Sequence, residues 1–270
     1  MVIDFHTHFF PDKIAESTVK ALEEKGGTPS FANGTMAGLV DAIDRAGVSL
    51  AVNLPVLTKP AQFDGILRFA KTVNESQERI ISFAGAHPDM EDKKGKMRLI
   101  KENGIKGIKI HPDYQGTFFD DDNYYELLKC AKDEDLIVVT HAGVDIGFLG
   151  ESVKCTPNRV LKQLSRLGGY DKLVLAHLGG DGYFDEVLDK IAGKEVYFDT
   201  GFVLKKFSKE NFNKLLSRHG DDKILFATDS PWSSIDGDLK LMKSFNLKQE
   251  TEDKILYKNA LKLLGLKAEL

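Results

Sequence analysis

The sequence predicts an α/β fold, a single (β/α)8 TIM barrel covering residues 1–270. Three observations predict it: short apolar segments alternate with amphipathic ones along the whole chain, the alternation occurs eight times at a period of about 30 residues, and polar residues follow the apolar segments at the same place in each repeat. Near-continuous apolar strands between amphipathic helices are typical of a parallel sheet that helices cover.

The first apolar segment, residues 2–8, has the period-two pattern of a strand. Ile3 and Phe5 face one side, and Asp4, His6 and His8 face the other. Two imidazoles on one strand face form a metal-ligand pattern, because neutral imidazole binds zinc and other divalent first-row metals. By itself such a His-x-His pair is more often structural or exposed than part of a ligand set.

A long irregular segment, residues 9–34, follows His8, and residues 13–25 within it have a helical pattern. Long loops in compact domains often cover or bind at functional sites, so we expect this segment to close over a site. Thr35 is the expected N-cap of the next helix, whose apolar stripe runs from Met36 to Ile43.

The other elements repeat in one order. Strands are predicted at residues 48–55, 80–86, 105–110, 136–140, 172–176, 195–198 and 223–228, and helices at about 61–77, 91–102, 122–134, 157–167, 181–192, 208–218, 237–245 and 251–264. An open doubly wound sheet is the structural rival. No strand is followed by a Gly-x-Gly-x-x-Gly or Walker-type loop, so nucleotide-binding versions of that fold are disfavoured.

The composition excludes several classes of function. With 42% hydrophobic and 29% charged residues, the chain has enough apolar material for a sizeable core. The net charge of −4 provides no basic field, which disfavours nucleic acid and membrane surfaces as partners. Two cysteines are too few for a disulfide framework. Neither a signal peptide nor a membrane span is predicted, so a cytoplasmic location is expected.

Polar residues collect where the predicted strands end. Six of the seven histidines lie there, namely His6, His8, His87, His111, His141 and His177, and two aspartates, Asp199 and Asp229, follow strands seven and eight. The active site of a (β/α)8 barrel lies at the carboxyl ends of its strands. Each residue taken singly is more often structural, but the shared position indicates one common site.

Four of these residues are the expected metal ligands: His6, His8, His141 and Asp229. A catalytic zinc site needs three or four nitrogen or oxygen ligands and an open position for water. His177, on the adjacent strand six, is the expected general acid or base, and Asp229 would combine ligation with proton transfer. The expected cofactor is one divalent ion, with Zn²⁺ as the first choice and a second ion as the alternative.

Four further residues are candidates for substrate binding: Lys109, His111, His87 and Asn53. Lys109 and His111 share the strand face that points into the barrel mouth. Lys109 would bind an anionic group or, when modified, bridge a second metal; alternatively it neutralises buried carboxylates while His111 caps a loop. For His87 and Asn53, a structural role is the alternative to substrate contact. Trp232 is expected either to form a pocket wall or to pack in the core.

Ordered motifs along the whole chain resemble the amidohydrolase superfamily, particularly the amidohydrolase-related branch that includes aminocarboxymuconate-semialdehyde decarboxylase. The motifs are Asp4-Phe5-His6-Thr7-His8-Phe9-Phe10-Pro11, Ile108-Lys109-Ile110-His111-Pro112, Thr140-His141-Ala142-Gly143, Ala176-His177-Leu178-Gly179-Gly180, Thr228-Asp229-Ser230-Pro231 and Asn259-Ala260-x-x-Leu263-Leu264-Gly265. The resemblance implies a barrel of the metal-dependent hydrolase type. It places His6, His8, His141 and Asp229 at the family's metal positions and His177 at its catalytic histidine.

The leading hypothesis is a metal-dependent hydrolase, in which metal-activated water attacks an amide, ester or lactone bond of a small anionic substrate. The alternative is a metal-dependent non-oxidative decarboxylase, a C–C lyase acting on a small carboxylic acid, in which His177 or Asp229 protonates the carbon that loses CO2. A related DNase is a third option, which the net charge disfavours. If the chain were a non-enzymatic binding module, the histidines and aspartates at the strand ends would have no catalytic role. The expected partners are a small-molecule substrate and, as an option, a second copy in a homodimer.

Overall fold

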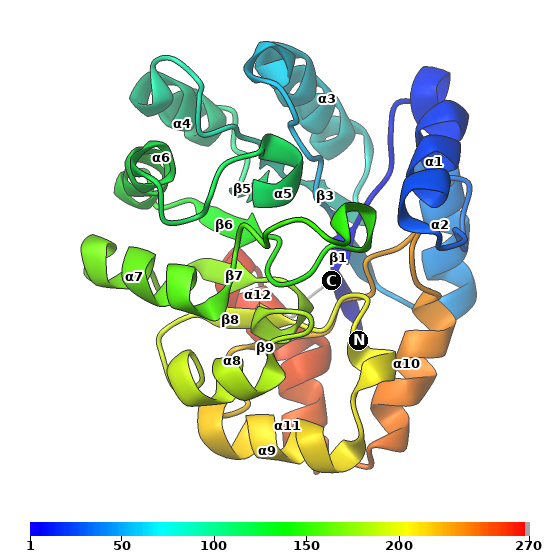
Figure 1. Cartoon of the computed structure of the whole chain (residues 1–270). Helices are drawn as coiled ribbons and strands as arrows, with labels where there is room; N and C mark the ends of the chain where they lie inside the picture. The colour runs from blue at the N-terminus through cyan, green and yellow to red at the C-terminus, as the bar shows by residue number, and fades with distance from the viewer. Residues whose placement is uncertain (268–270) are drawn as a thin grey trace.

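The computed structural model describes residues 1–267, which form a ring of short parallel strands surrounded by helices (Figure 1). The strands are β1 (Ile3–Thr7), β2 (Leu50–Asn53), β3 (Ile80–Ser82), β4 (Ala84–Gly85), β5 (Gly107–Ile110), β6 (Ile137–Thr140), β7 (Leu173–Leu175), β8 (Tyr197–Asp199) and β9 (Ile224–Leu225). Strands β1 to β3 pair in one sheet and β4 to β9 in another. Only Phe83 separates β3 from β4, so the two together occupy one of the eight predicted strand positions.

Backbone hydrogen bonds connect the last strand position back to the first. The amide of Phe5 donates to the carbonyl of Phe226 at 2.9 Å, and the amide of Asp229 donates to the carbonyl of His6 at 2.8 Å. Thr7 and Ser230 form a parallel bridge at the same seam. The predicted (β/α)8 barrel is confirmed.

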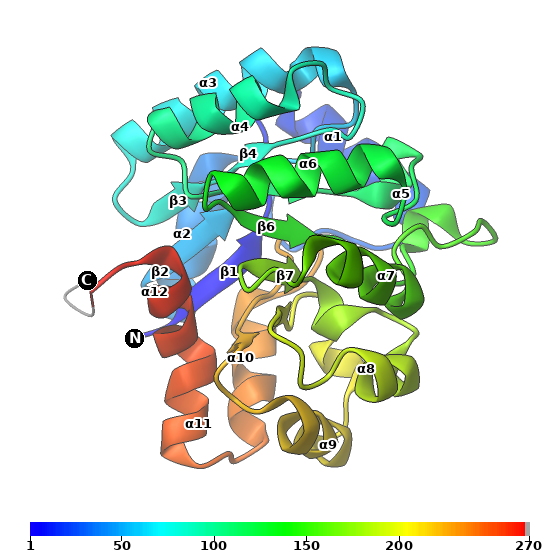
Figure 2. The same cartoon turned by 90° about the vertical axis from the view of Figure 1, so that its left-hand side faces the viewer.

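Helices cover the outside of the barrel (Figure 2). They are α1 (Asp12–Gly26), α2 (Met36–Ala46), α3 (Phe63–Ser76), α4 (Lys93–Glu102), α5 (Pro112–Gln115), α6 (Asp122–Asp133), α7 (Pro157–Leu167), α8 (Phe184–Lys190), α9 (Lys209–His219), α10 (Ile235–Ser244), α11 (Gln249–Asp253) and α12 (Asn259–Leu264). Thr35 caps α2 as predicted, since its hydroxyl accepts the amide of Gly38 at 3.0 Å. Between α11 and α12 a π-helical turn, Lys254–Lys258, continues the helical path. None of the helices in residues 1–267 combines the length and apolar character that a membrane crossing requires.

The core has two layers, which follow from the alternation of side chains along the strands. The larger layer lies between strands and surrounding helices, and includes Ile108, Val138 and Phe226. A smaller cluster includes Phe5 and Val139 with the apolar face of α12: Ala260, Leu261, Leu263 and Leu264. Apolar packing therefore occupies one end of the barrel, which leaves the carboxyl ends of the strands for polar groups.

The predicted strict alternation of β1 is interrupted. Its pairing with β2 is irregular between Asp4 and Thr7. The buried carboxylate of Asp4 accepts hydrogen bonds from the hydroxyl (2.6 Å) and the amide (3.0 Å) of Thr228, whereas His6 reaches Asp199 on β8. Irregular pairing redirects side chains within a strand. Asp4 therefore fastens the seam between β1 and the segment behind β9, and His6 turns toward the strand ends.

Candidate active site

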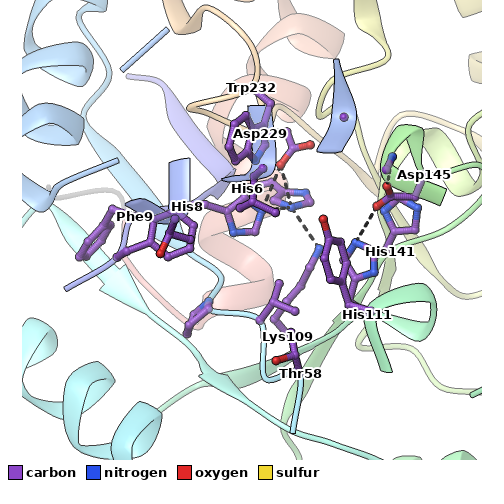
Figure 3. Close-up of a pocket in the computed structure, with 18 of the residues that line it drawn as sticks. His6, His8, Phe9, Thr58, Lys109, His111, His141, Asp145, Asp229 and Trp232 are labelled. Atoms are coloured by element: carbon purple, nitrogen blue, oxygen red, sulfur yellow. Dashed lines mark hydrogen bonds and ion pairs between the residues drawn. The ribbon is translucent and has the colours of Figure 1, made fainter. Parts of the chain in front are cut away.

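A cavity of about 630 Å³ opens at the carboxyl ends of the strands (Figure 3). Its polar lining includes seven of the predicted site residues: His6, His8, Lys109, His111, His141, His177 and Asp229. Each of them lies on a strand or within a few residues of its carboxyl end. The barrel topology thus brings together residues that are up to 223 positions apart in the sequence (6 to 229).

Three of the predicted metal ligands form one group. The Nε2 atoms of His6 and His8 lie 3.1 Å apart, and Oδ1 of Asp229 lies 3.4 Å from the first and 3.1 Å from the second. Their ligand atoms lie within 4.8 Å of one another, and Figure 3 shows them pointing toward a common centre.

Asp199 fixes the tautomer of His6. Nδ1 of His6 lies 2.9 Å from Oδ2 of Asp199, and because a carboxylate only accepts, this nitrogen carries the proton. Nε2 of His6 is therefore unprotonated, and its lone pair faces His8, Asp229 and the amine of Lys109. The other oxygen of Asp199 accepts the backbone amides of His177 at 3.1 Å and Gly201 at 3.0 Å. One buried carboxylate thus orients both a candidate ligand and the candidate catalytic histidine.

His177 and His141 form a hydrogen-bonded pair. Nδ1 of His177 lies 2.8 Å from the carbonyl oxygen of Gly201, so this nitrogen carries the proton. When His177 is neutral, its Nε2 accepts from Nδ1 of His141 at 2.9 Å. Nε2 of His141 is then unprotonated, and it is buried without a hydrogen-bond partner.

Both predicted catalytic residues have left-handed backbone conformations. The φ angle is 60° at His177 and 63° at Asp229. Such conformations are unfavourable for residues other than glycine by roughly 1–2 kcal/mol, and they persist where surrounding contacts determine them. Strained residues of this kind occur preferentially at active sites and ligand clamps.

The four predicted ligands lie in two groups that could hold a metal ion: His6, His8 and Asp229 form one, and His141 is in the other with His111 and Asp145. The rings of His111 and His141 stack with centroids 4.2 Å apart and planes inclined by 12°. Oδ2 of Asp145 lies 3.2 Å from Nε2 of His111. The loop after β6 therefore supplies an aspartate that the sequence interpretation missed.

The ionisation of these groups follows from their burial. Desolvation, followed by the charge of Lys109, lowers the pKa of His6 well below its ordinary value, so its imidazole is neutral. Burial raises the pKa of the Asp229 carboxyl, but the hydrogen bond from His8 favours the ionised form, and the pKa lies below its usual range. A neutral imidazole with an unprotonated nitrogen beside an ionised carboxylate fits a divalent first-row metal ion.

Lys109 lies beside the first ligand group, with its Nζ 3.1 Å from Nε2 of His6. Burial lowers the pKa of this amine to about 8, and the nearby carboxylates of Asp199 and Asp229 oppose the shift. The amine of Lys109 is thus less basic than that of an exposed lysine, and it lies at the cavity floor.

Two predicted substrate contacts, Asn53 and His87, are not among the residues that line the cavity. The Asn53 amide accepts the backbone N–H of Phe9 at 3.1 Å and donates to Ser82 at 3.0 Å, so it joins strand ends. Nδ1 of His87 accepts the amide of Asp89 at 3.2 Å. Both residues are buried and satisfy local backbone groups, and this explains their positions at strand ends without a ligand.

Aromatic side chains form much of the cavity wall: Phe9, Phe10, Phe69, Tyr114, Phe202 and Trp232. Helix α1 closes one side, as expected for residues 9–34, and contributes Ile14 and Leu22. It meets the loop behind β6, where Nζ of Lys25 lies 3.4 Å from the ring centroid of Phe148. Tyr114, on α5, was not anticipated because α5 has only four residues and no periodicity to reveal it.

Solved structures with the same fold include enzymes that act on aromatic acids. They include 2,6-dihydroxybenzoate decarboxylase from Rhizobium (TM-score 0.70, 16% identity, covering 98% of each chain) and 5-carboxyvanillate decarboxylase from Sphingomonas paucimobilis (0.68, 13%, covering 98% of this chain and 99% of the other). A third is dihydroxybenzoic acid decarboxylase from Polaromonas sp. JS666 with bound manganese and the inhibitor 2-nitroresorcinol (0.71, 16%, covering 99% and 98%). At these identities the likeness establishes the fold alone.

No curated protein matches the sequence. The family model described as Amidohydrolase matches residues 3–266, which is nearly the whole chain and includes every ligand and cavity residue described above. Together with the barrel and its ring of histidines and aspartates, that match shows that this chain belongs to the amidohydrolase family.

Proposed function

We propose that this chain is a metal-dependent, non-oxidative decarboxylase of a small planar carboxylic acid. The proposal rests on the lining of the cavity: ionisable groups lie on its floor, and aromatic side chains form much of its wall. Such a cavity suits a flat apolar ring that bears a carboxylate. The decarboxylases among the similar structures act on dihydroxybenzoate and carboxyvanillate, which are molecules of this kind.

His6, His8 and Asp229 are the residues that would hold the divalent ion. A bound ion would supply Lewis acidity and a fixed positive charge for the substrate carboxylate and a neighbouring oxygen. Zn²⁺ is the expected ion from the ligand chemistry, and Mn²⁺ is the ion in the similar Polaromonas enzyme, so both belong in the test.

The reaction breaks the bond between the carboxyl carbon and the ring. The ring carbon keeps the electron pair and takes up one proton, and CO2 leaves. His177 is suited to deliver that proton because its Nδ1 is held by Gly201, which leaves Nε2 to carry a proton between His141 and the substrate. Asp229 is the second candidate for proton delivery, since it also lines the cavity floor.

Lys109 would bind the substrate carboxylate. Its amine is buried on the cavity floor and lies 3.1 Å from Nε2 of His6, so an anion placed beside the ligand group would also contact the ammonium. In a buried site such a charged hydrogen bond is stronger than in water.

Hydrolysis of an amide, ester or lactone is the second candidate function. The position of Lys109 beside His6 favours it, because a modified lysine at this place would bridge to a second ion as the sequence interpretation suggested. The two reactions place the same groups around a substrate and differ in the step that follows: water attacks a carbonyl carbon in hydrolysis, whereas a ring carbon takes up a proton in decarboxylation.

A paired substrate panel tests the proposal. The protein is stripped of metal, reconstituted with Mn²⁺ or Zn²⁺, and incubated with hydroxylated benzoic acids and, in parallel, with their methyl esters, anilides and related lactones. We expect CO2 release and a ring product 44 Da lighter from the acids. Both should disappear with chelator, and their rate of formation should fall about 10²- to 10⁴-fold in His177→Asn. Turnover of esters or lactones without any CO2 would replace this proposal by the hydrolase.

A further inference from the structure

The cavity is larger than the proposed reaction requires. Its volume of about 630 Å³ lies within the range of about 300–1,000 Å³ in which proteins hold drug-sized ligands, whereas a hydroxylated benzoic acid is a much smaller molecule. Figure 3 shows Phe9 on the side of the cavity away from His141 and Asp145. Beside the polar groups of the floor, the cavity therefore has room for a further part of a substrate.

Two segments that follow neighbouring strands supply an apolar part of the lining. β1 pairs with β2, and residues of the segments 9–28 and 55–69 behind these two strands line the cavity. The two segments meet where the rings of Phe9 and Phe69 pack edge to face, with centroids 5.5 Å apart. Figure 1 shows their helices, α1 and α3, on the same side of the barrel. We call this part of the lining the apolar arm; it consists of Phe10, Ile14, Leu22, Val56, Ile66 and Phe69.

Helix α1 has two apolar faces, and only one of them is buried in the protein. Ala15 and Val19 are buried, whereas Ile14 and Leu22 line the cavity together with Thr18. Residues four positions apart lie on one face of a helix, so these three side chains form a single stripe. Ile14 is 48% exposed. Exposed apolar surface beside a cavity is typical of a ligand-binding groove, and this face of α1 is therefore available to an apolar ligand.

Gly65 leaves the apolar arm open along α3. It lies in the first turn of that helix and lines the cavity. A Cβ atom built at this position would have no neighbouring atom within 4 Å. A helical backbone does not require glycine, which is less favourable there than alanine. The position can therefore accept a side chain, and a large one would reduce the space in the arm.

The apolar arm offers no partner for a charged ligand group. Its six side chains are all apolar. Thr58 and Gln62, which also line the cavity, bond to each other, since the hydroxyl of Thr58 donates to Oε1 of Gln62 at 3.1 Å. The same oxygen accepts the backbone amide of Lys59 at 2.9 Å. A charged group in the arm would lose its hydration without gaining a partner, whereas an apolar group would be favoured.

We propose that the substrate carries an apolar substituent of several carbon atoms, which lies in the apolar arm while the carboxylate lies on the cavity floor. This inference rests on the proposed function, because that reaction places the carboxylate beside the amine of Lys109 and the ligand group. A carboxylate held there turns the para position of the ring away from the floor. An alkyl group at the para position is therefore the one that reaches the arm.

A homologous series of acids tests the apolar arm. The manganese-loaded full-length protein is given 2-hydroxybenzoic acids that carry hydrogen, methyl, propyl or pentyl para to the carboxylate, and kcat/KM is measured from CO2 release. We expect kcat/KM to rise about two- to fourfold for each added methylene, and thus by more than about tenfold from hydrogen to pentyl. A pentyl chain that ends in a second carboxylate should lose this gain, because nothing in the arm pairs with its charge.

Variants of the lining locate the effect. Ile14→Gln should lower the ratio of kcat/KM for the pentyl acid to kcat/KM for the unsubstituted acid about threefold, because an amide replaces apolar contact. Leu99→Gln is the matched control: Leu99 lies on α4, is 39% exposed and does not line the cavity, so the ratio should stay as in the wild type. In Gly65→Phe the gain should stop at a shorter chain, whereas Gly65→Ala should retain it.

Two results would overturn the inference: a kcat/KM that does not rise with chain length, or an Ile14→Gln variant that behaves like Leu99→Gln. Circular dichroism spectra like that of the wild type establish that the variants are folded. If no acid of the series releases CO2, the proposed reaction fails, and the dissociation constants of the same acids, measured by titration calorimetry, decide about the arm. A Kd that falls with chain length retains the arm as a binding site, and a constant Kd removes it.

Discussion

The carboxylate of Asp199 on β8 accepts a hydrogen bond from Nδ1 of His6 on β1 at 2.9 Å, and both side chains are buried. The bond joins residues 193 positions apart and decides which nitrogen of His6 faces the ligand group. Outer carboxylates of this kind orient metal-binding histidines and raise their basicity.

Asp199→Asn should therefore weaken metal binding while the protein stays folded. An amide can present its NH2 to Nδ1 of His6, which would move the imidazole proton to Nε2 and block the lone pair. We expect the Kd for Zn²⁺, measured by competition with a chromogenic chelator, to rise about 10- to 100-fold. Asp189→Asn serves as the surface control, and an unchanged Kd in Asp199→Asn would show that this contact does not set the tautomer.

His177→Asn and His8→Gln should separate proton transfer from metal binding. His177→Asn removes the group that carries the proton, so we expect kcat for CO2 release to fall about 10²- to 10⁴-fold while the ion in the first group is retained. His8→Gln should lose that ion together with activity. Kinetics and metal analysis on the same preparations distinguish the two outcomes; loss of the first ion in His177→Asn would mean that His177 is a ligand.

Trp232→Ala should weaken substrate binding through the cavity wall. The indole borders the cavity beside Asp229, and an aromatic contact together with its buried area contributes roughly 1–2 kcal/mol. That corresponds to about a tenfold rise in KM for an aromatic acid. Leu149→Ala, an exposed apolar residue outside the cavity, should leave KM unchanged. Equal KM values in both variants would show that Trp232 does not contribute to substrate binding.

Thr228→Val should destabilise the closure of the barrel. The hydroxyl of Thr228 donates to the buried carboxylate of Asp4 at 2.6 Å, and valine fills the same space without a donor. An unsatisfied buried acceptor costs about 1–3 kcal/mol in the free energy of unfolding, measurable by urea denaturation. Thr72→Val, at an exposed position of α3, should change the stability by less than about 0.5 kcal/mol. A Thr228→Val variant as stable as Thr72→Val would contradict a structural role for the hydrogen bond between Thr228 and Asp4.

His219 should make the stability depend on pH. Burial against Phe198 lowers the pKa of this histidine from 6.5 to about 4, so the folded protein keeps it neutral where the unfolded chain takes up a proton. Its contribution is fully present above pH 6.5 and is lost as the pH falls toward 4. At roughly 1.4 kcal/mol for each pKa unit, the loss reaches at most about 3 kcal/mol.

His219→Phe should remove that part of the pH dependence, because phenylalanine cannot take up a proton and can still stack on Phe198. The measurement is the free energy of unfolding between pH 4 and pH 7 for both proteins. As the pH falls from 7 to 4, the difference in unfolding free energy should shift by up to about 3 kcal/mol in favour of the His219→Phe variant. Parallel curves would show that His219 is not the group responsible.

The barrel could be predicted from the sequence because its determinants are local and repeated. The apolar stripe of α2, its cap at Thr35 and the apolar runs of β2 and β6 each specify an element without reference to the rest of the chain. The same repetition placed the polar residues at strand ends and so selected seven of the residues that line the cavity. Short elements such as α5 and the split of one strand into β3 and β4 were not predictable, since they have too few residues to show a period.

By itself the sequence determined the fold class, the family resemblance and the end of the barrel where the chemistry collects. Only the tertiary structure decided which groups these residues contact. Asn53 and His87 accept backbone amides near the strand ends. His141 lies beside His111 and Asp145, and Asp199 accepts a hydrogen bond from His6. The reason is physical: alternation along a strand fixes the face on which a side chain lies, whereas its partners depend on strand register, on backbone irregularities such as that of β1, and on loops that have no period.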